Sequence, residues 1–141
     1  MEPLSLAFGI AGLTGLALEL NKIISEYIGS VKHASAESCE LAAELSALAH
    51  VSERLYVFLG NKGAKCKSFD NTSVLYSVTA SCHDKLNRLK PILQDFMNAS
   101  EGRNWYRNIV WPLKKKEHLQ IIKILHQCME IFHFSLTIDG W

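Results

Sequence analysis

Residues 4–18, near the amino terminus, constrain the fold of this chain more than any other stretch. Their sequence is Leu-Ser-Leu-Ala-Phe-Gly-Ile-Ala-Gly-Leu-Thr-Gly-Leu-Ala-Leu, which contains no charged residue and only two polar side chains, Ser5 and Thr14. A helix of this composition has apolar residues on every side, which is typical of a helix buried in a bundle or in contact with lipid. Pro3 suits the first turn of such a helix, where its missing N–H would be unpaired anyway.

Gly9, Gly12 and Gly15 recur at every third position of this segment. Each glycine inside a helix costs about 1 kcal/mol relative to alanine. Three together indicate a surface kept smooth for close helix approach, in a bundle or in a membrane. They also favour a helix that can leave its packed state. The candidates for membrane insertion are Leu4, Leu6, Phe8, Gly9, Ile10, Gly12, Leu13, Gly15, Leu16 and Leu18.

The apolar segment is too short for a conventional transmembrane span. From Pro3 to Leu18 it would form a helix about 24 Å long, against a hydrocarbon core of about 30 Å. A secretion signal is excluded because the preceding residues contain Glu2 and no Lys or Arg. After Leu18 the pattern becomes amphipathic, and Glu19 and Glu26 make this distal part acidic. Any inserting portion is therefore expected to stop near Leu18.

Helical periodicity along the rest of the chain predicts an all-α bundle in a single domain, residues 1–141, which we expect to be the N-terminal part of a longer protein. The main helices are expected at 4–32, 35–59, 72–98 and 113–138, with a short extra helix at 104–111. The core should include Leu45, Leu86 and Leu125. The spacing that carries the prediction is clearest at Leu41, Leu45, Leu48, Leu55 and Leu59, and at Ile122, Leu125, Met129, Phe132 and Leu136.

Three polar or helix-breaking residues add local detail to this prediction. Ser35 is a plausible N-cap for the second helix. Ser52 interrupts the leucine rhythm of that helix. Pro91 falls inside the third helical pattern and should kink or break the helix near Lys90.

Motifs that carry known chemistry are absent from the sequence. There is no phosphate-binding glycine loop, G-x-S-x-G elbow, C-x-x-C or H-E-x-x-H. His126 and His133 share a helical face, but Cys128 points elsewhere. Cys82, His83 and Asp84 are consecutive and would point about 100° apart on a helix, which excludes a triad. We therefore predict no catalytic, cofactor-binding or metal-binding residue, and no enzymatic activity.

The four cysteines indicate the compartment. Cys39, Cys66, Cys82 and Cys128 are widely and irregularly spaced. Cys82 and Cys128 fall on apolar helical faces, where a free thiol behaves as a small hydrophobe. We interpret all four as reduced, and the protein as cytoplasmic at rest.

Charge is distributed unevenly along the chain. Residues 1–60 carry three basic and seven acidic side chains, whereas residues 61–141 carry twelve and seven. Trp105, Tyr106 and Trp111 lie between basic groups, which is consistent either with base stacking on nucleic acid or with aromatics that plug the bundle end. The small charge excess favours the plug and no nucleic-acid partner. Lys114, Lys115 and Lys116 are candidates for contact with anionic lipid headgroups, on condition that they lie at the same end of the bundle as residues 4–18.

Three segments carry a family resemblance. The opening Met-Glu-Pro-Leu-Ser-Leu-Ala-Phe-Gly-Ile-Ala-Gly-Leu of residues 1–13 resembles that of fungal HeLo-like and related N-terminal domains, which precede nucleotide-binding or repeat regions in fungal NOD-like (STAND) receptors. Glu-Leu-Ser-Ala-Leu at 44–48 and Trp-Pro-Leu-Lys-Lys-Lys-Glu at 111–117 agree with it. The resemblance implies a helical bundle similar to the HeLo domain and to the four-helix domain of the mixed-lineage-kinase-like necroptosis executor.

Two functional hypotheses follow. The resemblance implies a membrane-perturbing or pore-forming effector of regulated cell death or incompatibility, which moves to the plasma membrane when neighbouring receptor domains oligomerise. Its partners would be membrane lipids, further copies of itself and the following receptor domains. The alternative is a non-toxic signalling or adaptor domain, in which the first helix is simply part of the core.

Overall fold

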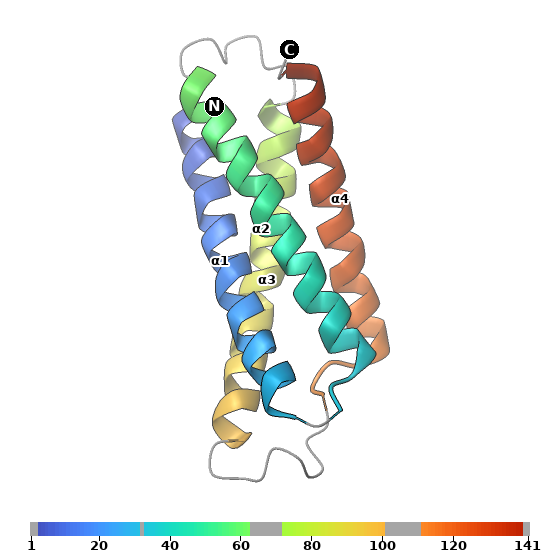
Figure 1. Cartoon of the computed structure of the whole chain (residues 1–141). Helices are drawn as coiled ribbons and strands as arrows, with labels where there is room; N and C mark the ends of the chain where they lie inside the picture. Colours follow the sequence, from blue (N-terminus) through green and yellow to red (C-terminus); the bar gives the residue numbers. More distant parts are fainter. Residues whose placement is uncertain (1–2, 32, 63–71, 101–110, 140–141) are drawn as a thin grey trace.

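The computed structural model describes residues 3–31, 33–62, 72–100 and 111–139 of the chain. These residues form four α-helices: α1 (Pro3–Ser30), α2 (Ala36–Lys62), α3 (Thr72–Ser100) and α4 (Lys115–Asp139). Successive helices run in opposite directions along one bundle axis, as Figure 1 shows. The described residues contain no strand, and the predicted helical bundle is confirmed.

The four helices do not follow one another around the bundle. α1 packs against α2 and α3, and α4 packs against the same two helices, so α1 and α4 are diagonal, as are α2 and α3. Consequently α1 and α3 are parallel neighbours, and so are α2 and α4 (Figure 1). The most extensive of the four interfaces joins α1 to α2.

The inward side of α1 explains why this helix joins the bundle. Its most deeply buried residues alternate at spacings of three and four, the pattern by which antiparallel and parallel helices pack side by side. They are Leu6, Ile10, Leu13, Ala17, Leu20, Ile24 and Tyr27, each at most 3% exposed. Burial of each large side chain stabilises the fold by about 1.5–3 kcal/mol. The segment is apolar on every side, as the sequence indicates, but only one side of it is buried.

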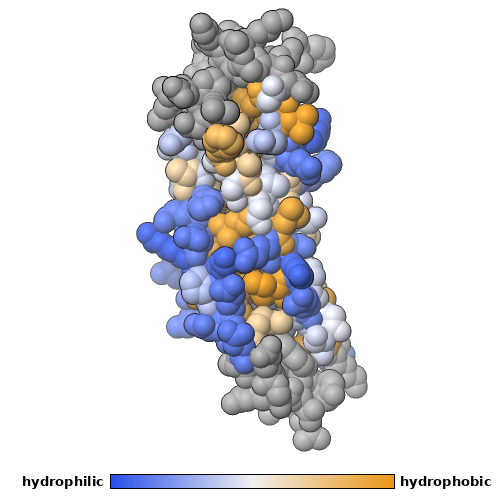
Figure 2. All heavy atoms as spheres, turned by 90° about the vertical axis from the view of Figure 1, so that its left-hand side faces the viewer, coloured by the Kyte–Doolittle hydropathy of each residue, from blue (hydrophilic) through white to orange (hydrophobic). Residues whose placement is uncertain are grey.

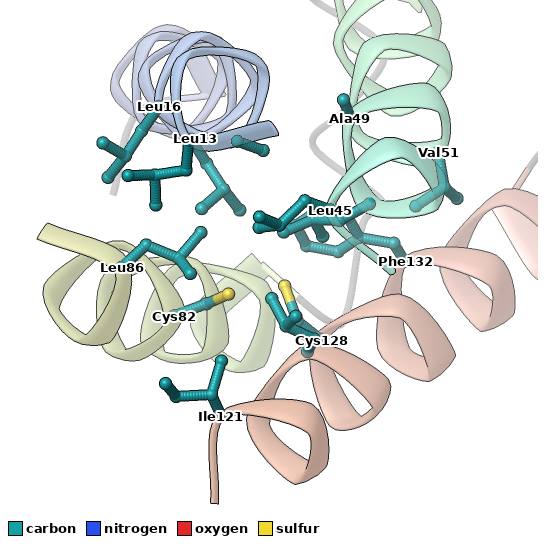
Figure 3. Packing of buried hydrophobic residues seen from close by; sticks show 14 of the residues in the cluster. Leu13, Leu16, Leu45, Ala49, Val51, Cys82, Leu86, Ile121, Cys128 and Phe132 are labelled. Carbon is teal, nitrogen blue, oxygen red and sulfur yellow. The ribbon is translucent and has the colours of Figure 1, made fainter. Parts of the chain in front are cut away.

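All four helices contribute to one continuous core. The predicted core residues Leu45, Leu86 and Leu125 are at most 1% exposed. Figure 3 shows the middle of this core, where Leu45 of α2 lies between the side chains of α1 and α4. Cys82 of α3 and Cys128 of α4 face each other there, both fully buried, as predicted from their apolar surroundings in the sequence.

The observed helix ends lie within three residues of the predicted ones. Ser35 caps α2 as predicted, since its Oγ accepts a hydrogen bond of 3.1 Å from the Ser38 backbone N–H. The predicted break at Pro91 is wrong, because α3 continues through this residue. Pro91 lies on the exposed side of α3, where water can satisfy the carbonyl left without its helical donor.

The predicted short helix at 104–111 lies outside the described residues except for Trp111, which is not helical. Trp111 is nevertheless part of an aromatic cluster at the end of the bundle. Its ring centroid lies 5.2 Å from that of Tyr27 and 6.0 Å from that of Phe96. Burial raises the pKa of the Tyr27 phenol in this cluster. The aromatic side chains therefore close this end of the bundle around the last turns of α1 and α3.

Candidate functional site

The residues predicted to insert into a membrane fall into two groups on opposite sides of α1. Leu6, Ile10, Leu13 and Leu16 are buried in the core. The outward face consists of Phe8, Gly9, Gly12, Gly15 and Leu18, all exposed. Leu4 belongs to α1, but its side chain lies outside the described part of the chain. The structure therefore separates one apolar segment into a packed side and a free side.

The outward face of α1 is unusual because it exposes large apolar side chains without any charge. Phe8 is 63% exposed and Leu18 is 54% exposed, and the first charged residue of α1 is Glu19. Figure 2 shows the side of the molecule that carries α1, with a broken hydrophobic band bordered by hydrophilic residues. Single exposed apolar residues are common on proteins, whereas an uncharged face that exposes two large apolar side chains is a candidate interaction surface.

Polar contacts hold α1 to α2. The hydroxyl groups of Thr14 and Ser52 are 2.7 Å apart and share a hydrogen bond. Asn21 Nδ2 donates a hydrogen bond of 2.6 Å to the backbone carbonyl of Ala42. Ser52, which interrupts the spacing of leucines in α2, is completely buried. Its hydroxyl group is the hydrogen-bond partner of Thr14, the one polar side chain among residues 6–18. Such a buried pair favours one register of the two helices over its neighbours.

The contacts between α1 and α3 are looser. A Cβ atom added at Gly9 would lie 3.7 Å from Thr79 Cγ2, and one added at Gly12 would lie 3.9 Å from His83 Nε2. Both distances are ordinary van der Waals contacts, so neither glycine is required for steric reasons. One ion pair, Lys90 Nζ to Glu19 Oε1 at 3.0 Å, joins the helices farther along.

A groove lies between α1 and α3 beside the outward face. Its volume is about 350 Å³, and its lining includes Phe8, Gly9, Gly12, Tyr76, Thr79 and His83. The sequence analysis did not identify the α3 residues of this groove. These residues are spaced three to four positions apart, which places them on one face of α3. Nothing in the sequence indicates which helix that face contacts.

The parallel pair on the other side, α2 and α4, is joined by two histidine–glutamate contacts. His118 Nε2 lies 2.5 Å from Glu40 Oε1, and His126 Nε2 lies 2.8 Å from Glu44 Oε2. His118 is 1% exposed, and its Nδ1 has no hydrogen-bond partner among the described residues. These pairs were also missed by the sequence analysis, because their members are far apart in the chain.

The other chemistry-bearing residues singled out in the sequence are dispersed. His126 and His133 are exposed on α4, while Cys128 is in the core. Cys82 is buried, whereas the next two residues of α3 are more exposed. His83 lines the groove, and Asp84 forms an ion pair with Arg88 at 3.2 Å. Within the described ranges, no three His, Cys, Asp or Glu side chains form a group that could hold a metal ion.

The two core cysteines interact with each other. A hydrogen bond with Cys82, together with burial, raises the pKa of the Cys128 thiol above its usual value. Cys82, Cys128 and the exposed Cys39 are free thiols, and Cys66 lies outside the described residues. At neutral pH the Cys128 thiol therefore remains protonated and packs as an apolar side chain.

The predicted headgroup residues Lys114, Lys115 and Lys116 are all exposed. They lie at the start of α4, at the end of the bundle where α1 finishes rather than where it begins (Figure 1). They are therefore far from Phe8 along the bundle axis. In the closed bundle, these lysines and the first turns of α1 would not meet the same patch of membrane unless the bundle lies on its side.

The segment Leu6–Ser30 is long enough and apolar enough to cross a membrane. Buried core helices and signal sequences have the same property. Comparison with protein-family models, with curated proteins and with solved structures found no match to this chain.

Proposed function

We propose that this bundle is a membrane-perturbing effector domain whose active element is α1. At rest the helix packs in the bundle, and oligomerisation of the protein at the plasma membrane releases it into the lipid. The resemblance of residues 1–13 to HeLo-like domains supports a place for this activity in regulated cell death, in the N-terminal domain of a fungal NOD-like receptor. The structural observation that carries the proposal is the uncharged, exposed outward face of α1.

The free energy of insertion depends on how the two sides of α1 change their surroundings. Leu6, Ile10, Leu13 and Leu16 exchange one apolar medium for another, so their transfer to acyl chains changes the free energy little. Phe8 and Leu18 leave water, and burial of the parts that are still exposed contributes about 1–2 kcal/mol for each. The net apolar gain of α1 thus comes from its outward face.

The helices left behind set the opposing cost. When α1 leaves, the sides of α2 and α3 that covered its leucines become exposed to water. Contacts between several opened copies can cover these surfaces again, and this is the physical reason to expect activity only at high local density. A segment as short as residues 6–18 also needs bilayer thinning or oligomerisation to perturb the membrane.

The test is dye release from anionic lipid vesicles by the full chain fused to a trimeric coiled coil. The informative variant is Gly15→Glu, because nothing lies within 4 Å of a Cβ at that position and the bundle should remain folded. A charge in the bilayer centre costs about 2.5–3.5 kcal/mol, so this variant should lose most of the release. Ala47→Glu adds the same charge on the exposed side of α2 and should leave the release unchanged.

The adaptor hypothesis makes the opposite prediction for the same experiment. If the trimeric fusion leaves vesicles intact, or if Gly15→Glu releases dye as the unmodified protein does, α1 is not the membrane-active element. The outward face would then be assigned to binding of another protein. Circular dichroism melting curves of both variants show whether the bundle is folded in each measurement.

A further inference from the structure

The groove between α1 and α3 has the size and lining of a small-molecule site. Its volume of about 350 Å³ is at the lower end of the range of about 300–1,000 Å³ that is typical of ligand sites. Gly9 and Gly12 form one wall without side chains, and the aromatic rings of Phe8 and Tyr76 lie at its border. Such a cleft suits a flat ring system that lies against the glycine backbone and contacts the two aromatic side chains.

Charge excludes most ionic ligands. The carboxylate in the groove lining, Asp84, is already paired with Arg88 on the surface of α3. No lysine or arginine lines the groove among the described residues. An anionic ligand would therefore find no cation, and a cationic ligand would compete with Arg88. The groove accordingly favours a neutral molecule.

A threonine in the groove lining lacks a hydrogen-bond partner. Thr79 is 4% exposed, and its Oγ1 makes no hydrogen bond within the described part of the structure. Its methyl group, Cγ2, lies 3.7 Å from the position of a Cβ atom on Gly9, so the methyl group packs toward α1 while Oγ1 is buried. Rotation about χ1 moves the hydroxyl group toward the side now taken by the methyl group, and threonine in helices uses two such rotamers. A ligand hydroxyl in the groove would supply the missing partner.

His83 adds a second polar group on the same side. It is half-buried, lies beside Gly12 and has no hydrogen bond or ion pair within the described residues. Its imidazole can donate or accept a hydrogen bond. Thr79 and His83 are four residues apart on one face of α3, so a single ligand can reach both.

From this geometry we propose that the α1–α3 groove is a binding site for a neutral, flat, mostly apolar molecule with one hydroxyl group. The ring system lies against Gly9 and Gly12 between the aromatic side chains. The hydroxyl group bonds to Thr79 or His83. This site overlaps the proposed membrane contact of α1, because it shares Phe8, Gly9 and Gly12 with the outward face.

Ligand binding would also affect the release of α1. A molecule that contacts both α1 and α3 stabilises the closed bundle, because it binds that state and not the open one. This consequence rests on the proposed function and would appear as slower dye release. The binding experiments below use no membrane, so the site and the effector activity can fail independently.

The first test is a heteronuclear NMR titration of the full chain with 2-naphthol, compared with 2-methylnaphthalene, which has the same size and no hydroxyl group. We expect saturable binding of 2-naphthol, with the largest shifts at Gly9, Gly12 and Thr79, and binding of 2-methylnaphthalene about fivefold weaker. Absence of saturable binding up to the solubility limit, or largest shifts outside α1 and α3, would overturn the proposal.

Matched leucine substitutions then locate the ligand. Gly12→Leu places a side chain in the groove, whereas Gly15→Leu adds the same side chain where nothing lies within 4 Å. We expect Gly12→Leu to weaken 2-naphthol binding more than tenfold and Gly15→Leu to change it less than twofold. Equal affinities in the two variants would contradict the site. If Gly12→Leu does not fold, Gly12→Ala replaces it, with an expected loss of about threefold.

A third variant tests the hydroxyl contact. Thr79→Val keeps the shape of the side chain and removes the unpaired Oγ1, so the bundle should remain folded. We expect it to reduce the preference for 2-naphthol over 2-methylnaphthalene by about half or more, with the remainder assigned to His83. A preference that is unchanged in both Thr79→Val and His83→Phe would show that the groove does not recognise a hydroxyl group.

Discussion

The two parallel helix pairs of the bundle, α1–α3 and α2–α4, are held together differently. The α2–α4 pair has two histidine–glutamate contacts, one of them with the buried His118. The α1–α3 pair has Gly9 and Gly12 at its border, a groove, and the ion pair between Lys90 and Glu19. The first pair is thus fixed by directional contacts, and the second by apolar packing around an open cleft.

This difference indicates how the bundle would open. α1 has its most extensive interface with α2, and the Thr14–Ser52 and Asn21–Ala42 hydrogen bonds reinforce it. The α1–α3 side offers less resistance, because its ion pair is partly exposed to solvent and such pairs contribute about 0–1 kcal/mol. We therefore expect α1 to separate from α3 before it separates from α2.

The largest expected effect contrasts the two sides of α1 itself. Leu13→Ala removes a fully buried side chain and should lower the free energy of unfolding by about 2–5 kcal/mol. Leu18→Ala alters a side chain that is 54% exposed and should change it by about 0.5 kcal/mol or less. Urea unfolding of the two variants measures both values. Similar losses would mean that the outward face is covered in solution, by another copy or by another part of the chain.

A smaller effect compares the two helix pairs directly. His118→Ala removes a buried contact to a carboxylate on the α2–α4 side and should destabilise the bundle by about 1.5–3 kcal/mol. Lys90→Ala removes the α1–α3 ion pair, whose side chains are 33% and 45% exposed, and should cost less than about 1 kcal/mol. Thermal or urea unfolding of each variant gives the comparison. A larger loss for Lys90→Ala than for His118→Ala would show that the α1–α3 pair, and not the α2–α4 pair, has the stronger directional contact.

The smallest expected effect is a pH dependence of the free energy of unfolding. It arises from the contact between Cys82 of α3 and Cys128 of α4. Because the pKa of the Cys128 thiol is raised in the folded state, the unfolded chain loses this proton first as the pH rises above about 8.5. The folded state then binds more protons than the unfolded state, so the free energy of unfolding falls by up to about 1.4 kcal/mol per pH unit. Below that pH the thiol contributes no pH dependence.

Unfolding measured between pH 7 and pH 9.5 tests this expectation. Cys128→Ala should reduce the slope above about pH 8.5, because it removes the thiol whose pKa is raised in the folded state. Equal slopes in the unmodified protein and in Cys128→Ala would show that the thiol ionises as easily in the folded bundle as in the unfolded chain.

Local chemistry made much of the bundle predictable from sequence. The spacing of leucines in α2 and α4 reports which side of each helix is apolar, and Ser35 satisfies the first N–H groups of α2 in the way that its side chain allows. These signals depend on residues within one or two helical turns of each other, so the sequence alone is enough to recognise them. The break expected at Pro91 does not occur, because its cost depends on whether its side of α3 faces water, which is a tertiary property.

The residues of α1 illustrate the limit most clearly. The sequence by itself determines that residues 4–18 are apolar, uncharged and interrupted by three glycines. Because apolar residues occur on all sides, these residues taken alone contain no signal that distinguishes Leu13, which is buried, from Leu18, which is exposed. That choice was made by the positions of α2 and α3, which cover one side of α1 only.

The same reason applies to every contact between distant segments. Contacts such as Thr14 with Ser52, His118 with Glu40, and Gly9 with Thr79 form because α1 and α4 occupy diagonal corners of the bundle. Helix order around a bundle depends on the sum of many weak packing interactions, none of which a local pattern records. The sequence therefore determined the helices and their apolar composition, and the tertiary structure alone decided which apolar face remained exposed and where the groove formed.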